Sequence, residues 1–349
     1  MLIVTSAQAY PAGAPGGPRL SVLDRSSIRA GQDPSRAVRE TVDFARAAEG
    51  LGYHRFWVSE HHGVPGLAGP APTVLAMAIA ERTASIRVGT GGVMLPNHRP
   101  LAVAEQFGVL EALHPGRIDM GLGRSLAFTS GIRRALGTGR DSAADFPERL
   151  AELLGYFTGD QHDHPGVRAY PGEGLRPAPF LLGTGAGSAE LAGRLGLALV
   201  TAPARGEDAM AGAVARYRDA FRPSVWGAGP YVVVALGVAV APTEQEARRL
   251  LVPEAWAQAH ARTRGFFPPL EPAERVAERE MTPRQREYLE ESVAAGLYGT
   301  PARVRAELAR LTGRIGADEL LVTLSTYDRA EMLDSYRMLA EAVEPAPAH

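Results

Sequence analysis

A repeated pattern of short apolar runs, each followed by a helical pattern, constrains the fold more than any other feature of the chain. The runs have the length of buried strands, and the segments after them carry apolar residues at the spacing of one helical face. Eight such units within 349 residues predict the α/β class and a (β/α)8 TIM barrel, which takes ~250 residues before insertions. A doubly wound sheet would need fewer strands, or a GxGxxG motif near the start, and the chain has neither feature. The eight predicted strands lie at residues 20–23, 55–59, 86–90, 118–122, 180–182, 197–201, 231–239 and 319–323.

Two insertions interrupt this repeated strand–helix pattern. The first follows strand four, between Arg124 and Pro179, and carries a predicted helix near residues 147–157. The second separates strands seven and eight, and its stretch rich in Pro and Arg, residues 260–282, is predicted to be a mobile lid because long loops are usually functional or disordered. The Gly/Pro-rich residues 1–19 are predicted to be a flexible extension, so that residues 20–349 form the barrel domain.

The composition excludes several kinds of chemistry. The chain contains no cysteine and no lysine, which excludes disulfides, thiol catalysis, Schiff-base chemistry and the lysine of a P-loop. Its formal net charge of -2 gives no electrostatic footprint for nucleic acid or an anionic membrane. No apolar run approaches the ~20 residues of a membrane helix. We therefore expect a cytoplasmic protein with neither a nucleic-acid nor a membrane partner.

Polar residues follow four consecutive predicted strands. Active sites of (β/α)8 barrels lie at the C-terminal ends of the strands, so these residues are expected to converge on one rim. The stretch 181–196 runs from a strand through small residues into a helix, which exposes backbone N–H groups to a phosphate. The alternative is a tight turn whose helix is capped by a serine. The rim residues are Glu60, His61, His62, Gly91, Gly92, Asn97, His98, Arg124, Ser125, Thr184, Gly185 and Ser188.

Two of these groups leave alternatives open. The glycines in residues 88–100 either admit a flat group and an unusual backbone, including a cis non-proline bond, or form a β-bulge. A metal site at residues 60–62 is disfavoured, because adjacent histidines on a strand point to opposite faces, HExxH spacing is absent and no third clustered ligand is evident. His61 is then predicted to be a general acid–base group, since its pKa lies near neutral pH. The alternative is that one histidine packs and the other caps.

These residues lie in stretches that resemble the bacterial luciferase-like monooxygenases. The resemblance runs from about Leu20 to Val343, in the order and spacing of that family. It is carried by LGYHRFWVSEHHG, VGTGGVMLPNHRPLAVAEQFGVLEALHPGRIDMGLGRS, GTGAGSAELAGRLGLALV and GADELLVTLSTYDRAEMLDSYRMLAEAV.

The resemblance implies a (β/α)8 barrel that uses reduced FMN (FMNH2) or, in one branch, the deazaflavin F420; the E-H-H triplet is closer to the FMN branch. It places His61 beside the flavin as the catalytic histidine. His62 would lie behind His61, further from the flavin, and Glu60 would orient both histidines. A cis bond at Gly91–Gly92 would lie behind the flavin ring. The remaining residues implied to bind the cofactor are Asn97, Arg124, Ser125, Thr184, Gly185 and Ser188.

The function implied is a flavin-dependent monooxygenase. Reduced FMN from a separate flavin reductase would react with O2 to give a flavin peroxide that hydroxylates a small organic substrate or inserts oxygen in a Baeyer–Villiger reaction, as part of secondary metabolism. Gly123 and Thr184 stand where the luciferase α subunit has a reactive cysteine and a glutamate, so light emission from a long-chain aldehyde is not implied. The alternatives are an F420-dependent dehydrogenase and a flavin-binding protein without turnover. A homodimer is expected.

Overall fold

The computed structural model describes residues 10, 18–126 and 129–343. Most of the predicted extension, residues 1–19, lies outside these residues, although Arg19 is already part of the first strand. The chain divides into two compact units. Unit 1 comprises Trp57–His62 and Ala71–Val233 with the first residues of the chain, and unit 2 comprises Gly13–Phe56, Gly63–Pro70 and Val234–His349.

The strand order confirms the predicted fold class. The sheet has ten strands in the order β10-β1-β2-β3-β5-β6-β7-β8-β9, with β4 beside β5 and a further pairing of β10 with β8. Because β10 pairs with both β1 and β8, the order returns on itself, as in a TIM barrel. The eight barrel strands are β1 (Arg19–Asp24), β2 (Arg55–Val58), β3 (Arg87–Thr90), β5 (Ile118–Gly123), β6 (Ala178–Leu182), β7 (Ala198–Thr201), β8 (Val232–Val240) and β10 (Glu319–Thr323).

Unit 1 carries the strands from the end of β2 to the start of β8 and the helices between them. Gly121 lets β3 and β5 approach closely, because a Cβ there would lie 1.9 Å from the carbonyl oxygen of Thr90. Its other elements are α2 (Pro72–Arg82), β4 (Val93–Met94), η2 (Leu95–Asn97), α3 (Pro100–Leu113), α4 (Ser130–Ala135), η3 (Arg140–Ala143), α5 (Phe146–Thr158), α6 (Ala186–Leu195) and α7 (Glu207–Ala220).

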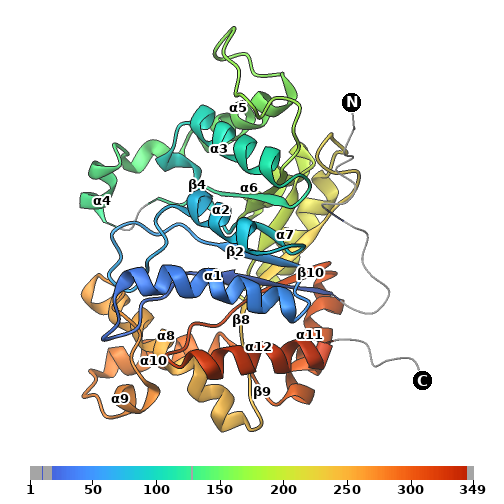
Figure 1. Cartoon of the computed structure of the whole chain (residues 1–349). Helices are drawn as coiled ribbons and strands as arrows, with labels where there is room; N and C mark the ends of the chain where they lie inside the picture. The colour runs from blue at the N-terminus through green and yellow to red at the C-terminus, as the bar shows by residue number, and fades with distance from the viewer. Residues whose placement is uncertain (1–9, 11–17, 127–128, 344–349) are drawn as a thin grey trace. The chain divides into compact units, whose positions relative to one another are not determined.

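Unit 2 carries the first and last helices, α1 and α12, which Figure 1 shows side by side. An ion pair with no solvent exposure joins two of its strands: Arg55 Nε lies 2.9 Å from both carboxylate oxygens of Glu319. Ser21 Oγ also donates to this carboxylate. The other elements are α1 (Pro34–Gly50), α8 (Glu244–Arg264), α9 (Ala273–Ala277), α10 (Pro283–Ala294), β9 (Leu297–Gly299), α11 (Pro301–Ile315) and α12 (Arg329–Val343).

Residues 260–282, the predicted lid, are partly helical. Helix α8 continues to Arg264, and α9 forms within the segment. Leu270 is fully buried, its N–H donates to the carbonyl of Ile28, and its own carbonyl accepts from Ala30. The segment is therefore anchored to its own unit by backbone hydrogen bonds, and its action as a lid stays a prediction. In the described part of the chain, no helix combines the length and apolar composition needed to cross a membrane.

Candidate active site

The carboxylate of Glu60 is the centre of the polar network that follows β2. Its side chain has no solvent exposure. Its Oε1 lies 2.7 Å from His62 Nε2 and 2.9 Å from His98 Nε2, and its Oε2 accepts from the backbone N–H of Met94 at 2.9 Å. Asn97 Nδ2 donates to Oε1 at 3.3 Å. Glu60 therefore contacts His62 directly, and its role in orienting both histidines stays a prediction.

The pKa of Glu60 is set by two opposing causes. Burial alone would raise the pKa of the Glu60 carboxyl group, since a charge is costly away from water. Hydrogen bonds and charge from His98, with hydrogen bonds from His62 and the Met94 N–H, outweigh burial and lower the pKa below its ordinary value. The group is consequently held as an anion beneath two half-buried imidazoles.

His61 turns away from this carboxylate toward Ser59. Its Nδ1 lies 3.0 Å from Ser59 Oγ, and the ring is half-buried. The two adjacent histidines therefore have different polar neighbours, His61 with Ser59 and His62 with Glu60, as the alternation of side chains predicts. The catalytic role of His61 stays a prediction.

The glycines after β3 have the unusual backbone that their sequence suggested. The Gly91–Gly92 bond is a cis non-proline peptide, which confirms that expectation over a β-bulge. The Gly91 N–H donates to the carbonyl of Val58, so this bend lies beside the end of β2. A Cβ on Gly92 would lie 2.8 Å from the carbonyl oxygen of Gly121, so the position favours glycine.

The N-terminus of α6 is a candidate anion site, which we term the anion cradle. Its N-cap is Gly185, and no side chain caps it, which overturns the alternative of a serine cap. Cβ atoms on Gly185 or Gly187 would meet no atom within 4 Å, so the space beside these two glycines is open. Thr184 is exposed, whereas Ser188 is buried against Gly183. These features fit a phosphate, because uncapped N–H groups at a helix start favour anions.

Arg124 lies beside this cradle. Gly123, the last residue of β5, pairs with Leu182 of β6, so Arg124 emerges next to the loop that starts at Gly183. The Arg124 side chain is exposed, and no hydrogen bond or ion pair joins it to another described residue. Ser125 follows it and is also exposed. An unpartnered guanidinium next to an uncapped helix start is suited to a phosphate dianion.

Sequence reasoning missed part of this site. His98 was placed on the rim without a role, but it contacts both oxygens of Glu60. Its loop is fixed by Arg149, whose Nη1 donates to the His98 carbonyl at 3.1 Å. Asn97 contacts Glu60 through its amide nitrogen, and its role toward a cofactor stays a prediction. The available signal was positional, since Glu60 and His98 follow consecutive parallel strands.

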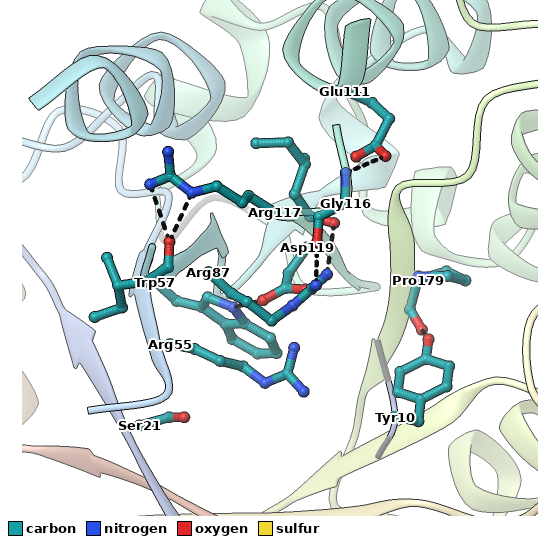
Figure 2. Close-up of polar contacts among 12 residues, drawn as sticks. Tyr10, Ser21, Arg55, Trp57, Arg87, Glu111, Gly116, Arg117, Asp119 and Pro179 are labelled. Atoms are coloured by element: carbon teal, nitrogen blue, oxygen red, sulfur yellow. Dashed lines mark hydrogen bonds and ion pairs between the residues drawn. The ribbon is translucent and has the colours of Figure 1, made fainter. Parts of the chain in front are cut away.

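A second buried polar cluster joins the starts of β3 and β5 to Trp57 of β2 (Figure 2). Arg87 at the start of β3 bonds to Asp119 Oδ1 through Nη2 at 2.7 Å, and Trp57 Nε1 donates to Oδ2 at 2.9 Å. Nearby, Glu111 accepts from the Gly116 N–H at 2.8 Å. Burial raises the pKa of the Glu111 carboxyl group to about 7, against the lowering effects of that hydrogen bond and of Arg87.

The fold and the anion cradle together define a (β/α)8 protein with a candidate phosphate site at the C-terminal strand ends. Residues 19–319 match the luciferase-like monooxygenase family, and the chain belongs to that family. YvbT of Bacillus subtilis (strain 168) is 38% identical over 327 residues, covering 92% of this chain and 96% of YvbT. The N-acetyl-S-alkylcysteine monooxygenase of the same organism is 33% identical over 332 residues, covering 93% of this chain and 98% of that protein.

Solved structures agree with this assignment. The crystal structure of apo-MsnO8 superposes with a TM-score of 0.80 at 35% identity, covering 93% of this chain and 98% of that one. The oxygenating constituent of 3,6-diketocamphane monooxygenase from Pseudomonas putida, in complex with FMN, gives a TM-score of 0.70 at 19% identity, covering 94% of this chain and 98% of that one. An F420-dependent secondary alcohol dehydrogenase gives 0.68 at 17% identity, covering 94% and 100%. These last two similarities concern the fold alone.

Proposed function

We propose that this chain is a flavin-dependent monooxygenase that uses reduced FMN and O2 to oxygenate a small organic molecule. The observation that carries the proposal is Arg124, which has no partner among the described residues and lies beside the uncapped N-terminus of α6. A phosphate-bearing cofactor satisfies both features at once, and the open space at Gly185 and Gly187 admits it. Membership of a monooxygenase family supports the same reaction class.

Under this proposal the residues divide into binding and proton-handling groups. Arg124, Thr184 and the first N–H groups of α6 hold the phosphate, and Gly91–Gly92 presents a surface without side chains to the ring. Bound reduced FMN supplies the electrons for activating O2. Ser59 holds Nδ1 of His61, so His61 exchanges its proton with the reacting groups through Nε2.

Oxygen dependence separates this function from its nearest alternative. The purified chain is mixed with candidate organic substrates and either reduced FMN or oxidised F420, in air-saturated and in anaerobic buffer, and product formation and the redox state of the cofactor are followed against mixtures without protein. The proposal predicts oxygen-dependent turnover with reduced FMN. Oxygen-independent turnover with F420 alone would replace it with an F420-dependent dehydrogenase, and binding without any turnover would indicate a flavin-binding protein.

The proposal includes two partners: a flavin reductase that supplies reduced FMN in the cytoplasm, and a second copy of the chain. Support for a homodimer comes from exposed apolar side chains on two adjacent helices of unit 1, α2 and α3, which are joined by a hydrogen bond from Thr73 to Gln106. Val74 on α2 is 70% exposed, and Val109 and Leu113 on α3 are 42% and 58% exposed. Sedimentation analysis should give a dimer that Val109→Arg weakens; a monomeric wild type would contradict this.

A further inference from the structure

We propose that Glu60, His62 and His98 form a binding site for one divalent transition-metal ion of the Zn²⁺ class, an inference that does not depend on the proposed reaction. Each residue offers one ligand atom, and these atoms all lie within 4.8 Å of one another. The sequence disfavoured a metal because no third ligand was evident near residues 60–62. His98 is that ligand, and it comes from the loop after the next strand.

The distances in the cluster are close to those of a bound site. Two ligand atoms about 2.0–2.1 Å from a tetrahedral ion are about 3.3 Å apart. Glu60 Oε1 lies 2.7 Å from His62 Nε2 and 2.9 Å from His98 Nε2. An ion at this position requires these two separations to open by about half an ångström, and the two imidazole nitrogens, which lie within 4.8 Å of each other, to approach to about 3.3 Å. Each neutral imidazole then carries its proton on Nδ1 instead of Nε2.

The surroundings hold the ligands in place. Glu60 Oε2 accepts from the Met94 N–H, which leaves Oε1 directed at the two imidazoles. The main chain of His98 is fixed by the hydrogen bond from Arg149. Such second-layer hydrogen bonds orient metal ligands in known sites and commonly change metal affinity by 10–100-fold. The cluster is therefore largely preorganised.

The ligand types select the kind of ion. Two imidazoles and one carboxylate favour Zn²⁺ and other first-row transition metals, whereas Mg²⁺ and Ca²⁺ prefer oxygen ligands. The side chains of His62 and His98 are 15% and 30% exposed, so an ion can reach them from solvent. Water can then complete the coordination.

The other histidine–glutamate pairs of unit 1 provide an internal contrast. His114 lies 3.1 Å from Glu81, and His164 lies 3.4 Å from Glu152. Neither pair belongs to a group of three ligands among the described residues, whereas the Glu60 cluster does. His114 is therefore a matched control for the loss of one histidine that faces one glutamate.

The test measures metal binding by protein without a polyhistidine tag, after removal of adventitious metal with a chelator. Zn²⁺ affinity is determined by competition with a chromophoric chelator, and Co²⁺ is added separately to record its visible absorption. The wild type should bind one Zn²⁺ and give the stronger absorption of Co²⁺ with four or five ligands. His98→Ala should weaken Zn²⁺ binding at least about tenfold, and His114→Ala should leave it unchanged.

Two further measurements separate a loss of metal binding from a loss of folding. Circular dichroism checks that His98→Ala is folded, and Glu60→Gln repeats the test with a neutral side chain of similar size. The proposal is overturned if the wild type binds no Zn²⁺, if His98→Ala binds it as tightly as the wild type, or if His114→Ala causes an equal loss. In those cases the cluster is a hydrogen-bonded triad only.

Discussion

The two buried polar clusters of unit 1 differ in how completely their charges are paired. At the N-terminal strand ends, Arg87 and Trp57 bond to the fully buried carboxylate of Asp119. At the C-terminal ends, Glu60 is equally buried, but its histidines are half-buried, and Arg124 is exposed without a partner among the described residues. In barrels of this class the first end serves stability and the second serves function. The buried Arg87–Asp119 pair and the exposed Arg124 fit that division.

The largest expected effect separates activity from stability at the C-terminal end. His61→Ala should lower product formation by roughly 10²–10⁴-fold, the contribution of a general acid–base group. Oxygen uptake should continue and hydrogen peroxide should accumulate, while the melting temperature and FMN affinity stay close to wild type. Product and peroxide assays check this. A larger loss in His62→Ala would assign the proton-handling role to the other histidine.

At the N-terminal strand ends we expect a loss of stability with unchanged cofactor binding. Arg87→Met leaves the buried Asp119 carboxylate without its cation, and loss of one partner of a buried pair typically costs about 3–5 kcal/mol. Urea unfolding should show that loss, with FMN affinity unchanged under conditions where the variant is folded. Arg168→Met, which breaks an exposed pair with Glu173, should cost less than about 1 kcal/mol and is the control. Equal losses of unfolding free energy in Arg87→Met and Arg168→Met would contradict the stabilising role of the buried pair.

A smaller effect is expected at Glu111, and it depends on pH. Because burial raises the pKa of this carboxyl group to about 7, ionising it costs more in the folded chain than in the unfolded chain. Its contribution to stability therefore falls as pH rises from its ordinary pKa toward 7, by at most about 3 kcal/mol. Glu111→Gln should raise the melting temperature relative to wild type more at pH 8 than at pH 5. Parallel pH profiles for the two proteins would contradict the raised pKa.

The sequence predicted the elements better than the contacts between them. All eight barrel strands were predicted near their observed positions, because buried strands and helical faces each have a regular apolar spacing. The two- and three-residue strands β4 and β9 are too short to show such a spacing. Helix α8 extends to Arg264, into the predicted lid of residues 260–282, because the Pro- and Arg-rich composition of that stretch suggests a loop from residue 260 onward.

The candidate site was predicted in part, because its residues follow the predicted strands. The strand-end rule identified residues of the rim, including Glu60 and Arg124, without knowledge of their contacts. It could not give the partners of Glu60, because the bonds to His98 and Met94 depend on the path of the backbone after β3. The buried pairs Arg55–Glu319 and Arg87–Asp119 were also not predicted, since a charged residue inside a strand pattern does not reveal its partner.

The central claim is that the unpartnered charge at the C-terminal ends binds the phosphate of the flavin. Anaerobic titration of wild type and Arg124→Ala with reduced FMN and with reduced riboflavin, which lacks the phosphate, tests it directly. Arg82→Ala, which removes an exposed arginine at the end of α2, is the control. A charge-assisted phosphate contact is worth roughly 1.5–3 kcal/mol, so Arg124→Ala should weaken FMN binding about 10–150-fold and leave riboflavin binding unchanged. Equal affinities of wild type and Arg124→Ala for FMN would contradict the account.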